Sequence, residues 1–296
     1  MQDSPYLTTE EAAAFLRIKV RKLYEMASTG AAPCSKVTGK WLFPRAALDR
    51  WIEAGMARPA GLALAGPPPI IGGSHDPLLE WAARHSGSGL ALLPVGSEAG
   101  LERLARDAIA IAAIHLHDLQ DDVRANEDAV GAQPDLYDAV VVAFVQREQG
   151  LMVAAGNPNG FVDVPGAINA QARFGLRQAG AGAQLLLERI LFRAGLKISE
   201  VRTGPRPYPT GQDLAQAIRT GDVDCGLATR AVANGLGLGF VPLEWERFDL
   251  VLRRRTFFEK EPQALFALMR SDEFARQAQV LGGYELTETG AVRLNR

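Results

Sequence analysis

The sequence has little of what marks secreted or membrane-spanning proteins. It contains two cysteines, Cys34 and Cys225, far apart and without a Cys-x-x-Cys pair, so no disulfide framework is expected. No apolar run reaches the eighteen or so residues that a transmembrane helix needs. The first residues also lack the basic start and apolar core of a signal peptide. These absences favour a protein of the reducing cytoplasm.

Charge of one sign is also scarce. The formal net charge is −2, but residues 1–56 contain eight Lys/Arg and six Asp/Glu, which gives them +2 and leaves −4 for the remainder. The whole chain is therefore not a polyanion binder. The asymmetry favours a nucleic-acid-binding head on a near-neutral body. The 296 residues suffice for a large core with a small module attached to it.

The first thirty residues predict two short helices joined by a tight turn. Thr8 and Glu11 have the spacing of a capping box, which starts the first helix. The second helix begins at Val20 and has its apolar residues at helical spacing. Gly30 ends it in the left-handed conformation, and Pro33 prevents its continuation. This pattern indicates a helix-turn-helix.

The segment that follows adds a wing. Residues 34–38 and 40–43 predict a short hairpin, and Pro44 fits the first position of a third helix. Basic residues of the second helix and the wing would neutralise phosphates, while the start of a recognition helix reaches base edges. A small helical interaction module with a solvated charged face is the alternative. The candidate DNA-contacting residues are Thr9, Lys19, Arg21, Lys22, Tyr24, Lys36, Lys40 and Arg45.

The order of residues in this region resembles the excisionase-like, MerR-type winged helix-turn-helix. The resemblance covers residues 5–53 and implies binding to double-stranded DNA. It departs from the family at Lys19, where a Ser or Asn cap is more common, and this weakens the cap by about 1 kcal/mol. The matching positions are Tyr6–Ala12, Tyr24, Gly30, Pro33, Gly39–Pro44 and Leu48–Ile52.

A segment rich in proline and glycine divides the chain. Residues 54–61 and 66–69 hold these residues at a density that permits neither a helix nor a central strand. The predicted organisation is a helix-turn-helix domain at 1–54, a semi-extended linker at 55–69 and a ligand-sensing domain at 70–296.

From Ile70 onward, short apolar runs alternate with helical stretches. This rhythm predicts a parallel sheet wrapped by helices. The pattern restarts near residue 173 and predicts a second sheet, so the fold class is α/β, with two lobes joined by crossing strands. The expected strands span residues 90–95, 109–112, 140–145, 151–154, 173–176, 224–227, 238–242 and 248–252, and the expected helices span 98–106, 183–194, 212–220, 262–269 and 273–278.

Motifs in this region resemble the periplasmic-binding-protein-like domain of molybdate-binding regulators. The resemblance implies a two-lobed type II solute-binding fold used as a sensor, hence a transcriptional regulator. The implied effector is an oxyanion such as molybdate or tungstate, and no other cofactor is expected. The matching segments are Gly73–Asp76, Val95–Ser97, Ile114–Leu116, Asn126, Gln149–Leu151, Gly156–Pro158, Arg177–Gln178, Gly221–Leu227 and Phe240–Leu243.

An oxyanion site needs helix N-termini and N–H or hydroxyl donors from both lobes. Ser74 and Ser97 precede helices, the amides of 180–182 serve the second lobe, and Arg147 and Arg177 supply positive charge. The alternative is that the serines are helix caps and the glycines turn formers. The candidate ligand-binding residues are Ser74, His75, Ser97, His115, Arg147, Arg177, Gln178, Gly180, Ala181, Gly182 and Thr210.

The second-lobe loop departs from the molybdate-type pattern. Where that family has Arg-Gln-x-Gly-Ser-Gly-Thr-Arg, residues 177–184 read Arg-Gln-Ala-Gly-Ala-Gly-Ala-Gln. Two hydroxyls and one guanidinium are missing, and each lost hydrogen bond to a charged group costs about 1.5–3 kcal/mol. A less charged or organic ligand is therefore the alternative to an inorganic oxyanion.

Other functions are disfavoured. His75, His115 and His117 match no familiar metal-ligand spacing, so no metal site is predicted. No nucleophile–base pair, Walker loop or dinucleotide fingerprint is present, so no catalytic residue is predicted and the protein is not expected to be an enzyme. A solute-binding protein of a transporter would have no need of a DNA-binding head. A homodimer is expected, because two-fold operators favour paired heads.

Overall fold

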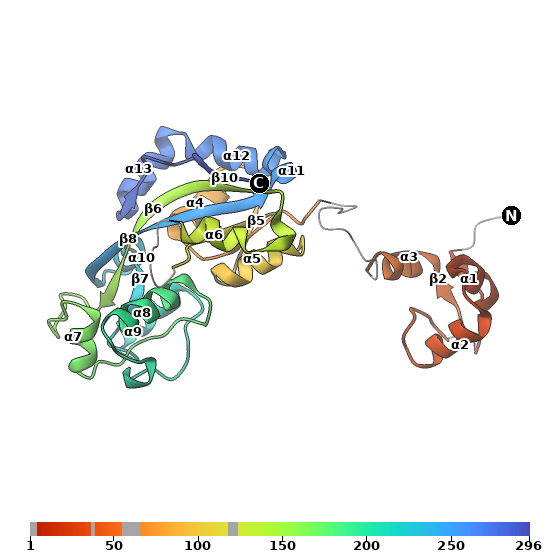
Figure 1. Ribbon diagram of the computed structural model, residues 1–296, viewed down its shortest axis with the longest axis horizontal. Coiled ribbons are helices and arrows are strands. Elements are labelled where there is room, and N and C mark those ends of the chain that lie inside the picture. The colour runs from red at the N-terminus through yellow and green to blue at the C-terminus, as the bar shows by residue number, and fades with distance from the viewer. Residues whose placement is uncertain (1–4, 37–38, 55–65, 118–123) are drawn as a thin grey trace. The chain divides into compact units, whose positions relative to one another are not determined.

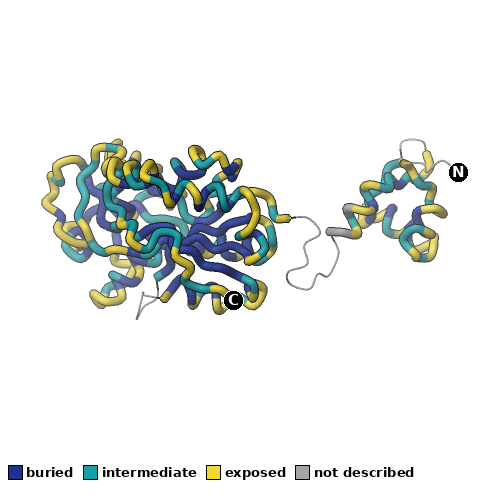
Figure 2. The backbone as a smooth tube through the Cα atoms, turned by 90° about the horizontal axis from the view of Figure 1, so that it is seen from above, coloured by how far each residue is buried: buried dark blue, intermediate teal, exposed yellow. Residues whose placement is uncertain are grey.

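The computed structural model describes residues 5–36, 39–54, 66–117 and 124–296. The chain divides into two compact units, Met1–Leu62 and Ala63–Arg296. Each unit has its own buried residues, which are dark blue in Figure 2. No helix among the described residues is long and apolar enough to cross a membrane.

The N-terminal unit holds three helices, α1 (Thr9–Leu16), α2 (Val20–Ser28) and α3 (Arg45–Ala54), all visible in Figure 1. The predicted capping box is confirmed: the Thr8 amide donates to Glu11 Oε2 over 2.8 Å, and the Glu11 amide donates to Thr8 Oγ1 over 3.3 Å. The helices enclose a small core of Ala12, Ala13, Leu23, Ala27, Ala32, Phe43 and Leu48.

The wing differs from the predicted hairpin. Ser35 and Leu42 form an antiparallel bridge, and each amide donates to the other's carbonyl over 2.8 Å. The following strand β2 (Phe43–Pro44) instead pairs with β1 (Tyr6–Leu7). Pro44 therefore ends a strand, and α3 begins one residue later than predicted, at Arg45. Residues 37–38 of the predicted hairpin lie outside the described residues.

The larger unit is built on an eight-stranded sheet in the order β10-β6-β8-β5-β3-β4, with β7 and β9 also paired to β6. Strand β3 runs parallel to both of its neighbours, β4 and β5. The other described pairings are antiparallel, so the predicted parallel sheet is wrong for most of the structure. The strands are β3 (Ile70–Gly73), β4 (Ala91–Pro94), β5 (Ile111–Ile114), β6 (Ala139–Val153), β7 (Cys225–Thr229), β8 (Gly239–Arg253), β9 (Tyr284–Glu285) and β10 (Val292–Asn295).

The long strands β6 and β8 cross from one lobe to the other (Figure 1). The sequence predicts two strands in place of each, because polar residues interrupt both apolar runs. In the structure these polar residues pair across the two strands; Arg147, for example, lies opposite Glu246. The register shifts at Gln149/Gly150 without ending the pairing. The predicted second sheet is therefore the far part of one continuous sheet.

Two further strand predictions are wrong. The strand at residues 90–95 is expected to be buried, but β4 is an edge strand and its outer residues, Ala91 and Pro94, are exposed. The segment 173–176 forms no strand, since Phe174 makes only isolated bridges to Thr203 and Cys225.

Helices cover both lobes and, apart from small shifts of their limits, the predicted ones are confirmed. The first lobe has two apolar clusters, which include Leu78, Phe144 and Phe248 in one and Leu101 and Ile114 in the other. Its helices are α4 (Pro77–His85), α5 (Ser97–Ala105), α6 (Ala125–Gly131), α11 (Arg254–Phe257), α12 (Lys260–Met269) and α13 (Asp272–Leu281). Those of the second lobe are α7 (Val164–Asn169), α8 (Gly182–Arg193), α9 (Gly211–Thr220) and α10 (Arg230–Gly235).

Candidate functional site

The centre of the larger unit holds a buried guanidinium. Arg147 projects from β6 and is 1% exposed. Its Nε donates to Glu246 Oε1 over 2.6 Å, and its Nη1 donates to Asp76 Oδ2 over 3.0 Å. The guanidinium carbon lies 3.9 Å from the centroid of the Phe248 ring. Arg147 is therefore held by partners within the protein rather than left open to a ligand.

The charged groups of this cluster stabilise one another in their ionised forms. Burial alone would lower the pKa of Arg147, but Glu246 and Asp76 raise it above its usual value. Burial alone would raise the pKa of the Glu246 carboxyl, but the positive charge of Arg147 and the hydrogen bond with His117 outweigh it and lower this pKa strongly. The guanidinium and the Glu246 carboxylate therefore stay charged at neutral pH.

Asp76 joins this cluster to helix α4. Its Oδ1 accepts from the amides of Leu78 and Leu79, which makes Asp76 the N-cap of α4. Its carboxylate also accepts from the hydroxyl of Tyr284 over 3.1 Å. One aspartate thus links α4, β6 and β9.

His115 follows β5 and carries a buried ring that is 6% exposed. Arg147 Nη2 lies 2.6 Å from its Nδ1, so Nδ1 accepts and the proton of the neutral ring resides on Nε2. Burial is the main cause that lowers the pKa of His115 well below its usual value, so the ring is neutral. Its Nε2 has no hydrogen-bond partner among the described residues.

The N-termini of two helices from opposite lobes meet at His115. Helix α5 begins at Ser97, whose Oγ bonds to both the carbonyl and the amide of His115 over 3.1 Å. Helix α8 begins at Gly182, where an added Cβ would lie 2.2 Å from the His115 ring and carbonyl oxygen. The two loops also touch, since the Glu98 amide donates to the Gly180 carbonyl over 3.4 Å.

Several donors at this meeting point have no acceptor. The amides of Ser97, Gly182 and Ala183 make no hydrogen bond within the described part of the chain, and His115 Nε2 is also unpartnered. Amides at a helix N-terminus carry partial positive charge and attract anions. These donors therefore give the meeting point of the two helices the partial positive charge that an anionic group would need.

The hydroxyls predicted to bind the ligand bond to the protein instead. Ser74 Oγ lies 3.0 Å from Ser97 Oγ, and Ser97 is fully buried. Because Ser97 Oγ also bonds to the backbone of His115, its hydrogen-bonding capacity is used within the first lobe. Ser74 remains half-buried beside it, on the path from the helix N-termini to the surface.

Arg177 supplies positive charge and contacts no carboxylate among the described residues. Its Nε donates to the Tyr208 carbonyl over 2.9 Å and its Nη2 to the Pro209 carbonyl over 2.7 Å. Burial, followed by repulsion from Arg147, lowers the pKa of Arg177 to about 10. An anion nearby would relieve both effects. The neighbouring Gln178 reaches the loop at Gly96, where an added Cβ would lie 3.5 Å from its Nε2.

His75 and Thr210 lie farther along the cleft and face a groove of about 570 Å³, which both lobes line. His75 Nε2 lies 3.0 Å from Glu80 Oε2. Thr210 is the N-cap of α9, where it exchanges hydrogen bonds with Asp213. Of the predicted residues, the structure gathers Ser97, His115, Gly180, Ala181 and Gly182 most tightly, with Arg147 behind them and Thr210 at the edge.

Four residues of this region are absent from the predicted ligand-binding set: Asp76, Gln149, Glu246 and Tyr284. Asp76 and Gln149 do lie in segments that carry the resemblance. Gln149 donates to Glu246 Oε1 over 3.0 Å. The available signal was the run of polar residues at 146–149, which lies between two apolar runs and which the sequence predicts to separate two strands. A group of three or more His, Cys, Asp or Glu that could hold a metal ion does not occur within the described ranges.

The candidate DNA-contacting residues of the smaller unit lie mostly on its surface. Lys19, Arg21, Lys22, Tyr24, Lys36 and Lys40 are exposed, whereas Thr9 and Arg45 are half-buried. The Lys19 side chain makes no cap hydrogen bond to α2, as expected from its residue type. The centroid of the Trp41 ring in the wing lies 6.5 Å from that of Tyr24 and 5.1 Å from Lys36 Nζ. One aromatic side chain therefore packs against two of the candidate DNA-contacting residues.

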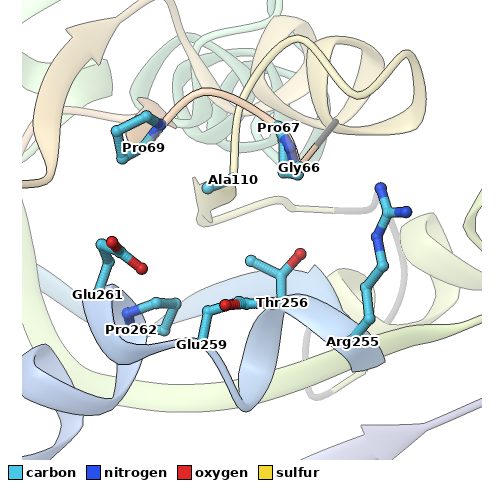
Figure 3. Close-up of a pocket in the computed structure, with 9 residues that line it drawn as sticks. All are labelled: Gly66, Pro67, Pro69, Ala110, Arg255, Thr256, Glu259, Glu261 and Pro262. Atoms are coloured by element: carbon cyan, nitrogen blue, oxygen red, sulfur yellow. The ribbon is translucent and has the colours of Figure 1, made fainter. Parts of the chain in front are cut away.

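A separate pocket of about 380 Å³ lies away from the cleft (Figure 3). Glu259, Glu261 and Pro262 form one wall with Arg255 and Thr256, and Gly66, Pro67, Pro69 and Ala110 form the other. None of the candidate ligand-binding residues lines it.

Comparison with known proteins agrees with this architecture. The model of the PBP superfamily domain matches residues 79–270, which is more than half of the chain, and the Helix-turn-helix domain matches residues 6–56. The protein is thus a DNA-binding regulator with a ligand-sensing domain of the periplasmic-binding-protein type, and neither matched domain is an enzyme domain. The chain belongs to the PBP superfamily.

Individual relatives are distant. The uncharacterized protein YvgK of Bacillus subtilis is 22% identical over 99% of both chains. The structure of PhnD1 from Prochlorococcus marinus in complex with methylphosphonate has a TM-score of 0.51 at 10% identity and covers 76% of this chain and 94% of its own. An H2O2-bound cysteine-to-serine mutant of OxyR from Corynebacterium glutamicum has a TM-score of 0.50 at 14% identity, over 93% and 89%. These likenesses show the fold.

Proposed function

We propose that the larger unit binds a small anionic effector where α5 and α8 meet and thereby controls DNA binding by the helix-turn-helix unit. The observation that carries the proposal is the set of unpartnered donors at the two helix N-termini, found within the described residues: the amides of Ser97, Gly182 and Ala183 and the Nε2 of His115. Arg177, which contacts no carboxylate within the described ranges, adds positive charge. The methylphosphonate complex of PhnD1, which shares the fold, supports an anion as ligand.

The identity of the anion is a separate part of the proposal. The resemblance of the sequence favours molybdate or tungstate, but the loop 177–184 lacks two hydroxyls and one guanidinium of the molybdate-type pattern. The structure adds that Ser97 is committed to the backbone of His115. The backbone amides would therefore carry the binding, and these discriminate weakly between tetrahedral anions.

Isothermal titration of the full-length protein with molybdate, tungstate, sulfate, phosphate and methylphosphonate tests the anion site. Binding of at least one of them with a Kd in the micromolar range is expected, together with a higher Tm in its presence because a ligand of the folded state stabilises it. The absence of heat and of any Tm shift with all five anions would contradict the site.

The regulatory part of the proposal rests on linkage between two units of one chain. An effector can change DNA affinity only by as much as its own affinity differs between the states that bind DNA well and poorly. We propose a homodimer, because one helix-turn-helix reads too few base pairs alone and paired heads match two-fold operators. The proposal places the protein in the cytoplasm, where its DNA is.

Gly182→Ala tests whether the observed contact between the lobes is the ligand-bound arrangement. The added Cβ would lie 2.2 Å from the ring and the carbonyl oxygen of His115, so α8 would have to move away from α5. Anion affinity is expected to fall at least about tenfold, which is about 1.4 kcal/mol. Gly131→Ala is the matched control, because its Cβ would meet nothing within 4 Å. Wild-type anion affinity in Gly182→Ala would show that the observed contact between the lobes is not the ligand-bound arrangement.

A further inference from the structure

We infer that the effector is an organic anion whose body passes His75 and lies in the groove between the lobes, and this inference rests on the anion site proposed above. The head of the effector would bind at the N-termini of α5 and α8. Its remaining atoms would then run along the surface between α4 and the start of α9. The inference replaces an inorganic oxyanion by a molecule with an anionic head and a polar body.

The groove has the size for such a body. It measures about 570 Å³ and is lined from the first lobe by residues of α4 and β4, and from the second lobe by Thr210, Gln212 and Asp213. Cavities of about 300–1,000 Å³ are typical of sites for organic ligands. A tetrahedral oxyanion at the helix N-termini would leave this space unused.

A chain of contacts links the groove to the start of α5. His75 lines the groove, and its neighbour Ser74 lies 3.0 Å, Oγ to Oγ, from Ser97 at the start of α5. A small cavity of about 10 Å³ beside them is lined by Ser74 and shares His75, Leu92 and Pro94 with the groove. The inferred route of the effector body therefore runs beside Ser74 and His75.

His75 presents an unused polar atom on this route. Its side chain is 10% exposed, and its Nε2 is 3.0 Å from Glu80 Oε2. In the tautomer that donates from Nε2 to the Glu80 carboxylate, Nδ1 is a hydrogen-bond acceptor. This Nδ1 is buried and has no partner among the described residues. A buried polar atom without a partner is costly, so a hydroxyl or amino group of the ligand would satisfy it.

The walls of the groove are mixed in character. Ala83, Leu90 and Leu92 offer apolar surface, while Glu80 and Asp213 offer carboxylates. Both carboxylates already have partners, Glu80 with His75 and Asp213 with Thr210. The group that best distinguishes the inferred ligand is therefore a donor placed for His75 Nδ1, a few bonds from the anionic head.

The test compares ligands of equal size. The full-length protein is titrated by calorimetry with phosphate, methylphosphonate, n-propylphosphonate and 2-hydroxyethylphosphonate. The last two have the same number of non-hydrogen atoms and differ in a terminal methyl against a hydroxyl. We expect 2-hydroxyethylphosphonate to bind tightest, and better than n-propylphosphonate by about two- to tenfold, the usual net effect of one hydrogen bond.

Two variants locate the effect. His75→Phe keeps a ring but removes Nδ1, so the hydroxyl preference is expected to disappear while phosphate binding stays. Gln212→Trp fills the groove from α9 without touching His75, so both larger phosphonates are expected to weaken relative to phosphate. Glu261→Gln, in the separate pocket of Figure 3, is the control and should bind every ligand like the wild type.

The outcomes separate this inference from the proposed function. If phosphate binds but the larger phosphonates do not, the site is one for inorganic anions and the organic effector is wrong, while the anion site stands. A hydroxyl preference that persists in His75→Phe would also overturn the inference. If phosphate and all three phosphonates fail to bind while molybdate, tungstate or sulfate binds, the organic effector is wrong and the anion site stands. Failure of every anion would contradict the anion site itself.

Discussion

Replacement of Arg147 by methionine is expected to lower the free energy of unfolding by about 3–5 kcal/mol. The guanidinium is 1% exposed and is the cation that both Asp76 and Glu246 contact. Its loss would leave two buried carboxylates without this partner, and His115 Nδ1 without its donor. Methionine has a similar volume, so the loss of charge rather than a cavity would dominate. Urea unfolding of the full-length protein, followed by circular dichroism, measures the change.

The combination of Arg147→Met with Glu246→Gln serves as the control. Removing one of the orphaned charges should restore part of the lost stability, because the two residues interact directly and their effects are not additive. The single variant Arg147→Met could instead unfold like the wild type and lose anion binding completely. This result would make Arg147 a ligand-contacting cation, as the sequence predicts, rather than a structural one.

Arg21→Ala combined with Lys22→Ala is expected to weaken DNA binding by about 10- to 100-fold. Both side chains are exposed at the start of α2, the helix that would enter the major groove. Lys22 has Glu25 3.4 Å away on the same helix, but this pair is exposed to solvent and contributes little. The measurement is fluorescence anisotropy with a DNA fragment selected by the wild-type protein, repeated at several salt concentrations.

Salt dependence separates loss of contacts from misfolding. Each phosphate contact that is lost should lower the slope of log K against log salt by about 0.9. Arg106→Ala is the matched control, since this exposed arginine belongs to the other unit and should leave DNA binding unchanged. Effector affinity should remain at the wild-type level in both variants. Unaltered DNA affinity of the double variant would show that α2 is not the recognition helix.

Much of the fold could be predicted because its signals are local. Helix starts at Thr8 and Val20 depend on residues within one turn, and both are where the sequence places them. The limits of α8 and α9 follow from apolar spacing, and Thr210 caps the start of α9. Such features need no knowledge of distant parts of the chain.

The centre of the larger unit could not be predicted in the same way. Arg147 meets Asp76 from 71 residues away and Glu246 from 99 residues away. A single sequence shows that these side chains are charged but not that they compensate one another inside a sheet. For the same reason the sequence predicts that the polar stretch at 146–149 separates two strands. In the structure each of these side chains has a partner elsewhere in the fold, and β6 continues through them. The residues that sequence reasoning assigned to a ligand include His115 and Gly182, which the structure brings into contact.

The continuity of β6 and β8 has a mechanical consequence. Two lobes joined by flexible loops can swing freely, but here fifteen-residue strands run without interruption through both. Relative motion of the lobes must therefore bend and twist one continuous β-sheet. We expect the sheet to bend most easily at the register shift at Gln149/Gly150, where Gly150 lets the Phe240 ring and the Val241 carbonyl approach closely. We expect small, stiff rotations about this line, with elastic strain reaching β5 and β3 through their shared hydrogen bonds.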